Sequence, residues 1–262
     1  MVKESINTIA VIQARLGSTR LPGKVLLNIE SKPVLQHIVN RLRNVPAIEK
    51  VIVATSELEI NNKITSYCED NNIDFFVGNE QNVLDRFYNA AKIYHPKNVI
   101  RITGDCPLID PQTIEKLILF HKKNKYDYCG VATGAGVADN EKILRFPDGL
   151  DAEIFKFTVL EKAYLNATRK IEKEHVTPYI WGNPSLFNLG VLESDIDFSH
   201  YRLTLDNIED FHLINWIYTK LYNKNEFFNL KDIIQLIEKN KYKLETNKHL
   251  IGKEGYDIFK KK

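Results

Sequence analysis

Short apolar runs alternate with helical patterns along the first 125 residues of the chain. Residues 8–14, 50–56 and 98–104 are almost continuously apolar, and residues 73–78 form a shorter run of the same kind. Continuous apolar runs of this length are typical of parallel strands that are buried on both faces of a sheet. The alternation therefore predicts an α/β fold with a mainly parallel sheet and helices on both of its faces.

The segments between these strands have the periodicity of amphipathic helices. The predicted helices cover residues 33–45, 58–71, 82–95 and 110–123. In the first of them, one stripe contains Val34, Leu35, Ile38, Val39 and Leu42. The last begins at Asp110, a favourable N-cap residue, and has Pro111 at the first helical position, where proline is tolerated.

The regular alternation weakens beyond residue 125. Residues 126–133 and 201–206 are predicted as strands. Residues 134–155 mix turn formers with short β-like pieces, and we interpret them as an inserted lobe that carries substrate contacts. Further helices are predicted at residues 158–170, 172–181, 207–222 and 229–240.

The composition is that of an ordinary globular protein large enough to bury a full core. Of 262 residues, 44% are hydrophobic and 27% are charged, and the net charge is +2. This near balance argues against a nucleic-acid-binding protein that depends on bulk positive charge, so any recognition of anions should be local.

The cysteines and the N-terminal region bear on the cellular compartment. Cys68, Cys106 and Cys129 are far apart and lack the spacing of a zinc site or a disulfide framework. No apolar stretch approaches the ~18 residues of a membrane span, and the first residues do not form a signal peptide. We therefore expect a soluble cytoplasmic protein with neither a membrane nor a nucleic acid as its partner.

Three loops follow the predicted parallel strands directly: residues 15–24, 55–59 and 103–110. In doubly wound sheets, ligands bind outside the carboxyl ends of the strands. Segments that are distant in the sequence are thus expected to meet at one site.

The first loop, "RLGSTRLPGK", combines turn formers with Arg15, Arg20 and Lys24. Its two glycines are separated by five residues, and the lysine is followed by Val25, so it is not a P-loop, which needs four residues and a Ser or Thr. Backbone amides at such turns can bind anions, and three cations match a polyphosphate in charge. An ordinary exposed loop with solvated cations is the alternative interpretation.

Two aspartates come at or just past the ends of predicted strands. Asp105 is placed to hold Mg²⁺, which takes one or two carboxylates together with phosphates and water, although a turn-forming or capping role fits equally well. Asp110 is the better N-cap, which leaves Asp105 available. Asp206 could complete the metal site or cap the following helix, and the spacing does not decide between the two.

A family resemblance emerges from the motifs taken together. In order, the chain contains "VIQARLGSTRLPGKVL", "VLDRFYNAA", "RITGDCPLIDP", "GLDAEIF", "EHVTPYI" and "YRLTLDNIEDF". Over roughly residues 7–222, the sequence resembles the cytidylyltransferase family of CMP-KDO synthetase. Within that family it is similar to the branch named after spore coat polysaccharide biosynthesis protein F.

The resemblance implies a Rossmann-like nucleotidyltransferase fold of the glycosyltransferase-A type, a three-layer sandwich with a small inserted lobe for the substrate or for dimerisation. It implies transfer of CMP from CTP to an acceptor, with Mg²⁺ as the cofactor and pyrophosphate as the leaving group, for surface polysaccharide or cell-envelope synthesis. A homodimer is also expected. We interpret the chain as a single domain, 1–262, with a nucleotide-binding half (1–125), an acceptor or dimerisation part (126–205) and C-terminal helices (206–262).

The family's functional residues carry over by motif. The implied nucleotide-binding residues are Ala14, Arg15, Gly17, Ser18, Arg20, Lys24, Thr55, Asp85, Arg86 and Thr103. The implied catalytic residues are Arg15, Lys24 and Asp105, and the metal ligands are Asp105 and Asp206. The implied acceptor-side residues are Asp151, Glu153, Glu174 and His175.

These assignments leave several alternatives open. The acceptor is either a sugar acid or a phosphate- or phosphonate-bearing molecule, and His175 is either a general base or a structural histidine. A glycosyltransferase of the same fold is an alternative enzyme, but such enzymes commonly use an Asp-x-Asp motif, and here Cys106 and Pro107 follow Asp105. The third hypothesis is a non-catalytic nucleotide-binding paralogue.

Overall fold

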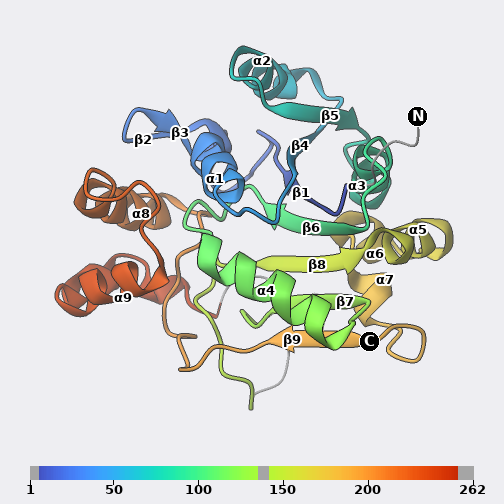
Figure 1. Ribbon diagram of the computed structural model, residues 1–262. Helices are drawn as coiled ribbons and strands as arrows, with labels where there is room; N and C mark the ends of the chain where they lie inside the picture. Colours follow the sequence, from blue (N-terminus) through green and yellow to red (C-terminus); the bar gives the residue numbers. More distant parts are fainter. Residues whose placement is uncertain (1–5, 135–141, 253–262) are drawn as a thin grey trace.

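The computed structural model describes residues 6–134 and 142–252. Its centre is a seven-stranded sheet with the strand order β5-β4-β1-β6-β8-β7-β9 (Figure 1). The strands are β1 (Thr8–Gln13), β4 (Lys50–Ser56), β5 (Asp74–Gly78), β6 (Asn98–Thr103), β7 (Tyr128–Val131), β8 (Ala152–Lys156) and β9 (Leu189–Leu192). The four strands from β5 to β6 are parallel, β8 is antiparallel to both of its neighbours, and β7 and β9 are parallel. The mainly parallel sheet is therefore confirmed.

The helices follow the predicted order. They are α1 (Val34–Arg43), α2 (Asn62–Asp70), α3 (Val83–Lys92), α4 (Pro111–Asn124), α5 (Phe157–Asn166), α6 (Lys170–His175), α7 (Pro178–Trp181), α8 (Ile208–Leu221) and α9 (Leu230–Glu238). A small hairpin of β2 (Asn28–Ile29) and β3 (Lys32–Pro33) precedes α1. The 3-10 helices are η1 (Lys24–Leu26), η2 (Glu59–Asn61), η4 (Lys241–Thr246) and η5 (Lys248–Leu250).

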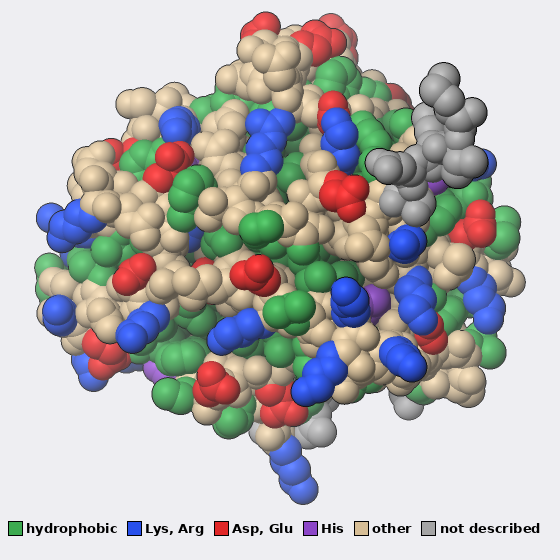
Figure 2. All heavy atoms as spheres, viewed as in Figure 1, with side chains coloured by type: hydrophobic (Ala, Val, Ile, Leu, Met, Phe, Trp, Pro, Cys, Tyr) green, Lys and Arg blue, Asp and Glu red, His purple; other side chains and the backbone are tan. Residues whose placement is uncertain are grey.

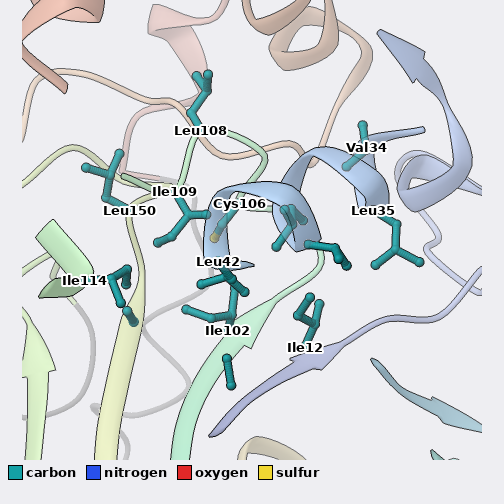
Figure 3. Packing of buried hydrophobic residues seen from close by; sticks show 14 of the residues in the cluster. Ile12, Val34, Leu35, Leu42, Ile102, Cys106, Leu108, Ile109, Ile114 and Leu150 are labelled. Atoms are coloured by element: carbon teal, nitrogen blue, oxygen red, sulfur yellow. The ribbon is translucent and has the colours of Figure 1, made fainter. Parts of the chain in front are cut away.

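Two layers of helices enclose the sheet. One apolar cluster joins one sheet face to α1, α2, α4, α8 and α9, and the other joins the opposite face to α3, α5 and α7. The stripe predicted on α1 is completely buried in the first cluster, where Leu42 lies near Ile102 of β6 (Figure 3), and Leu35 and Ile12 of β1 belong to the same cluster. Burial of each such side chain contributes about 1.5–3 kcal/mol to folding. Together the layers form the expected three-layer sandwich.

Two residues, the N-cap of α4 and the glycine after β6, determine how the loop between β6 and α4 lies at the edge of the sheet. The Asp110 carboxylate accepts a hydrogen bond from the Thr113 amide at 3.1 Å, which confirms Asp110 as the N-cap. Gly104 follows β6, and a Cβ there would lie 2.9 Å from the Gln13 carbonyl oxygen and 3.0 Å from Val25. The absence of a side chain at Gly104 lets the β6 loop lie directly against the end of β1.

Two local predictions were wrong. Residues 201–206 are not a strand, because they form only an isolated bridge between Arg202 and Asp148. The helix predicted at residues 172–181 is split into α6 and α7 at Val176, whose φ of 71° is incompatible with a continuous helix. Strand β9 was not predicted.

The segment expected to form an inserted lobe contributes β8, which enters the sheet between β6 and β7. Part of this segment, residues 135–141, lies outside the described ranges. On the face in Figure 2, basic and acidic side chains are interspersed, as expected from the near-balanced net charge. Among the described helices, none combines the length and apolar character that crossing a bilayer requires.

Candidate active site

Loops from distant parts of the sequence are joined at the carboxyl ends of β1, β4 and β6. The Leu16 amide donates to the Asn61 side chain at 2.8 Å, which links the first loop to the segment after β4. The Gly104 amide donates to the Gln13 carbonyl at 2.8 Å, and the Leu205 amide donates to the Asp105 carbonyl at 2.8 Å. The segments that the topology rule predicted to meet therefore do meet.

Lys24 lies at the centre of this edge. Its ammonium nitrogen is 3.0 Å from Asp105 Oδ2 and 2.8 Å from Asp206 Oδ1. Gly23, with a φ of 70°, makes the turn that directs the lysine inward. Burial alone would lower the pKa of Lys24, but the two carboxylates outweigh burial and raise it. Burial likewise opposes ionisation of Asp105, yet the neighbouring Lys24 holds the Asp105 pKa below its ordinary value. The Lys24 ammonium thus lies between the two carboxylates of this edge.

The two arginines of the first loop also form ion pairs with carboxylates. Arg20 Nη2 lies 2.8 Å from Asp206 Oδ2, and Arg15 Nη1 lies 2.7 Å from Glu80 Oε1. Both arginine side chains remain about half exposed, whereas Lys24 is buried. A phosphate ligand can therefore reach the arginines directly. Ser18 shapes the same loop, because its hydroxyl accepts a hydrogen bond from the Leu21 amide at 3.4 Å.

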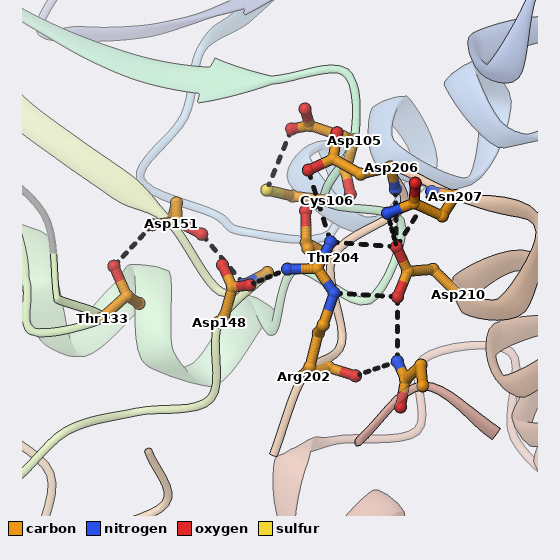
Figure 4. A network of polar contacts seen from close by, with 12 residues as sticks. Asp105, Cys106, Thr133, Asp148, Asp151, Arg202, Thr204, Asp206, Asn207 and Asp210 are labelled. Atoms are coloured by element: carbon orange, nitrogen blue, oxygen red, sulfur yellow. Dashed lines mark hydrogen bonds and ion pairs between the residues drawn. The ribbon is translucent and has the colours of Figure 1, made fainter. Parts of the chain in front are cut away.

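A buried arginine organises the segment around Asp206 (Figure 4). Arg202 donates to both carboxylate oxygens of Asp210, at 2.9 and 3.0 Å, and to Asp148 at 3.0 Å. Its Nη2 also lies 3.5 Å from Asp206 Oδ2. Asp210 accepts hydrogen bonds from the Asp206 and Asn207 amides, so it caps the start of α8. Asp206 is therefore not the cap, and its side chain faces Lys24 and Arg20.

Four more of the implied nucleotide-side residues, besides the three cations and Ser18, lie beside the first loop or within it. The Ala14 amide donates to the Ala54 carbonyl at 3.2 Å, and Gly17 is exposed with open space around it. The Thr55 hydroxyl is fully buried and has no hydrogen-bond partner among the described residues. The Thr103 hydroxyl lies 3.3 Å from the Cys106 sulfur. Thr55 is thus separated from solvent, whereas Gly17 and the loop are accessible.

The last two of the ten implied nucleotide-side residues are in the first turn of α3. Asp85 accepts a hydrogen bond from the Asn89 amide group at 3.0 Å. Arg86 is completely buried, and its Nη1 donates to the Asn79 carbonyl at 2.8 Å. Burial lowers the pKa of Arg86, and its Nε and Nη2 have no partner within the described ranges. Arg86 thus holds the turn that presents Glu80 to Arg15.

On the acceptor side, Glu153 of β8 faces Arg101 of β6 across the sheet. Arg101 Nη1 donates to Glu153 Oε2 at 2.6 Å, and the hydroxyls of Tyr128 and Thr177 donate to Oε1 at 2.5 and 2.7 Å. Asp151 accepts hydrogen bonds from the Thr133 hydroxyl and the Gly149 amide. Burial, reinforced by Asp105 and Glu153, nevertheless raises the pKa of Asp151.

His175 ends α6 at a strained turn. The following residue, Val176, has a φ of 71° and a ψ of −55°, and the Thr177 amide donates to the His175 carbonyl at 2.8 Å. This three-residue γ-turn is rare, and a β-branched residue at its centre stores strain, which is a common property of functional sites. Burial, with Arg101 nearby, lowers the pKa of His175. Glu174 is exposed on the same turn of helix.

Three residues that contact the site were missed by sequence reasoning: Glu80, Arg101 and Arg202. Arg101 was detectable, because a charge within the apolar run "NVIRITG" requires a buried partner. Arg202 comes four residues before Asp206. Its role was not detectable from the sequence, because its network also includes Asp148, which is distant along the chain. Glu80 lies in an ordinary polar turn, which carries no local signal.

The carboxylate pair fits Mg²⁺, or another cation that prefers oxygen ligands, better than a metal that needs His or Cys ligands. Asp105 and Asp206 both contact the Lys24 ammonium, so their carboxylates converge on one point. No group of three or more His, Cys, Asp or Glu residues suited to a metal occurs in the described part of the chain. Mg²⁺ needs only one or two protein carboxylates when phosphate oxygens and water complete its octahedron.

Comparison with known proteins identifies the family of the chain. The family model described as cytidylyltransferase matches residues 9–253. The spore coat polysaccharide biosynthesis protein SpsF of Bacillus subtilis is 32% identical over 88% of this chain and 93% of its own, and the uncharacterized protein MJ1063 of Methanocaldococcus jannaschii is 39% identical over 88% and 90%. The structure of a cytidylyltransferase from Leptospira borgpetersenii superposes with a TM-score of 0.82 at 30% identity, over 91% of this chain and 97% of that one. The chain therefore belongs to the cytidylyltransferase family, the nucleotidyltransferases that transfer CMP from CTP.

Proposed function

We propose that the protein transfers CMP from CTP to a small anionic acceptor, in an Mg²⁺-dependent reaction that releases pyrophosphate. The convergence of Arg15, Arg20 and Lys24 with Asp105 and Asp206 at one sheet edge is the observation that carries this proposal. These groups supply the positive charge for a triphosphate and the carboxylates for its metal.

The reaction requires an in-line displacement at the α-phosphorus. An acceptor oxygen forms the new bond to phosphorus while the bond to the bridging oxygen breaks, and the electron pair leaves with pyrophosphate. Such transfers depend on positioning and charge neutralisation. Lys24 and Arg15 offset the charge that develops on the leaving group. Mg²⁺ held by Asp105 and Asp206 would supply further charge neutralisation at the phosphates.

The acceptor side supports an anionic substrate with hydroxyl groups. Arg101 is partly exposed on this side of the site, and its guanidinium is the cation there that can receive a carboxylate or phosphate. Asp151 and Glu153 can accept hydrogen bonds from sugar hydroxyls. A sugar acid for surface polysaccharide synthesis has both the negative charge and the hydroxyl groups. A phosphate or phosphonate acceptor has the negative charge.

His175 is the candidate general base for a hydroxyl acceptor. Its lowered pKa keeps the imidazole neutral near pH 7, so it can take a proton. An acceptor that attacks through an ionised phosphate oxygen needs no base. The dependence on His175 therefore distinguishes the two acceptor classes.

We also propose a cytoplasmic location and a homodimer. All three cysteines are buried and unpaired, which suits a reducing compartment. Size-exclusion chromatography with light scattering tests the dimer directly. A mass of one chain, 30.3 kDa, would contradict it.

The proposed function is tested by measuring pyrophosphate release. The wild type is assayed with each of the four NTPs against sugar acids, phosphorylated polyols and phosphonates, with Mg²⁺ and with EDTA. We expect release only with CTP, Mg²⁺ and an anionic acceptor, and loss of release in Asp105→Asn. Release that is independent of CTP, or full activity in Asp105→Asn, would contradict the assignment.

A further inference from the structure

All four carboxylate oxygens of Asp105 and Asp206 are engaged by other side chains of the protein. Lys24 Nζ bonds to Asp105 Oδ2 and to Asp206 Oδ1, and Arg20 occupies Asp206 Oδ2 at 2.8 Å. The remaining oxygen, Asp105 Oδ1, lies 3.6 Å from the thiol of Cys106, which donates to it. The pair that fits a divalent metal is thus already neutralised by the protein's own cations.

Lys24 and a metal ion compete for the same oxygens. A divalent cation needs lone pairs of Asp105 and Asp206 that the lysine ammonium already uses, and the two positive charges would repel each other at this buried position. Because the Lys24 side chain is only 11% exposed, water screens that repulsion weakly. Metal can bind both carboxylates only if the ammonium moves away.

The triphosphate provides another partner for the displaced cations. Lys24 has a flexible four-carbon stem and begins the short helix η1, so its ammonium can swing without a change in the sheet. Arg20 is about half exposed and can turn towards a phosphate. When both cations bind phosphate oxygens, the carboxylates become available to metal.

We infer that Lys24 is a built-in counter-cation, which keeps metal off the Asp105–Asp206 pair until the triphosphate draws the lysine away. This inference rests on the proposed metal site and adds a binding order to it. Metal alone binds the protein weakly, and nucleotide and metal strengthen each other's binding, because such coupling is reciprocal. The consequence is a site that does not hold a metal ion without its substrate.

The test is a titration of the nucleotide-free protein with Mn²⁺, followed by electron paramagnetic resonance of the free ion. We expect Lys24→Met to bind Mn²⁺ at least ~10-fold more tightly than the wild type, equivalent to about 1.4 kcal/mol of relieved competition. Lys24→Gln, which keeps a polar group at the buried position, should show a gain in the same direction. Circular dichroism establishes that each variant is folded.

Two controls identify the site of the gain. Lys32 pairs with Glu226, with 2.9 Å between Nζ and Oε1, and this pair is not part of the Asp105–Asp206 site. Lys32→Met should therefore leave the Mn²⁺ affinity unchanged. Adding Asp105→Asn to Lys24→Met should abolish the gain.

If neither Lys24 variant binds Mn²⁺ more tightly, or if the gain survives Asp105→Asn, the inference is overturned. Pyrophosphate release by the wild type with Mg²⁺ and CTP is measured separately. The proposed function can therefore stand when the counter-cation role of Lys24 fails.

Discussion

Single residues at this site owe their roles to partners from distant segments. The sequence placed Lys24 in an anion-binding loop and Asp105 and Asp206 at strand ends, but it did not show that the lysine lies between the aspartates at 3.0 and 2.8 Å. The choice between capping and metal binding for Asp206 depended on Asp210, which caps α8 instead. The spacing offers two acidic residues for one capping role, because Asp206 precedes the N-cap Asn207 and Asp210 is the third residue of α8.

The pH dependence of transfer tests the role of His175. With a hydroxyl acceptor, the neutral imidazole is the active form, so kcat should fall as the pH drops through the His175 pKa, which burial lowers from its ordinary value. His175→Gln should lower kcat by about 10²–10⁴-fold and remove this acidic limb. With an acceptor that attacks through phosphate, the variant and the wild type should have parallel profiles. A hydroxyl acceptor whose acidic limb persists in His175→Gln would exclude His175 as the base.

At the scale of elements, the buried parallel strands were predictable and the long-range pairings were not. The apolar runs of β1, β4 and β6 and the N-cap of α4 carry strong local signals. Strand β9, "LGVL", is only four residues long, and the extended residues 201–206 look like a strand but lack neighbours on a sheet. The entry of β8 between β6 and β7 depends on cross-strand pairs such as Arg101 with Glu153, which no local pattern reveals.

Substitution of Gly104 tests the close approach of the β6 loop to β1. In Gly104→Ala, the new Cβ would lie 2.9 Å from the Gln13 carbonyl oxygen, so backbone must shift. We expect a loss of about 1–3 kcal/mol in the free energy of unfolding, measured by urea denaturation. The displaced Asp105 should also lower kcat of the folded enzyme. Gly17→Ala is the matched control, because a Cβ at Gly17 would have no atom within 4 Å. It should lower the free energy of unfolding much less. Equal losses in the two variants would contradict this explanation.

At the scale of the whole molecule, one buried network ties the C-terminal segment to the site. Arg202 joins Asp148, Asp206 and Asp210, and the Asn247 side chain donates to Asp210 at 2.9 Å (Figure 4). The C-terminal helices therefore do more than cover the sheet, because they fix the segment that carries Asp206. The three-layer architecture and the position of the site followed from the strand–helix alternation, but this link depends on tertiary contacts alone.

Removal of the Arg202 charge should destabilise the whole molecule. Arg202→Met leaves the carboxylates of Asp148 and Asp210 buried without their cation, which costs about 3–5 kcal/mol in the free energy of unfolding. Asn247→Ala removes the two hydrogen bonds that the side chain donates to the Arg202 carbonyl and to Asp210, and it should cost about 1–3 kcal/mol. Chemical denaturation of both variants measures whether the loss in free energy of unfolding is larger in Arg202→Met. A smaller loss in Arg202→Met than in Asn247→Ala would contradict the central place of Arg202.

The most direct test of the account follows the fate of the α-phosphate. The wild type is incubated with Mg²⁺, an anionic acceptor panel and either α-³²P-labelled CTP or α-³²P-labelled UTP, and the products are separated. The account predicts that label from CTP appears in a CMP-linked product in equal amount to the pyrophosphate released, and that Asp105→Asn and EDTA both abolish it. Transfer of label from UTP at the same rate, or pyrophosphate release without labelled product, would contradict it.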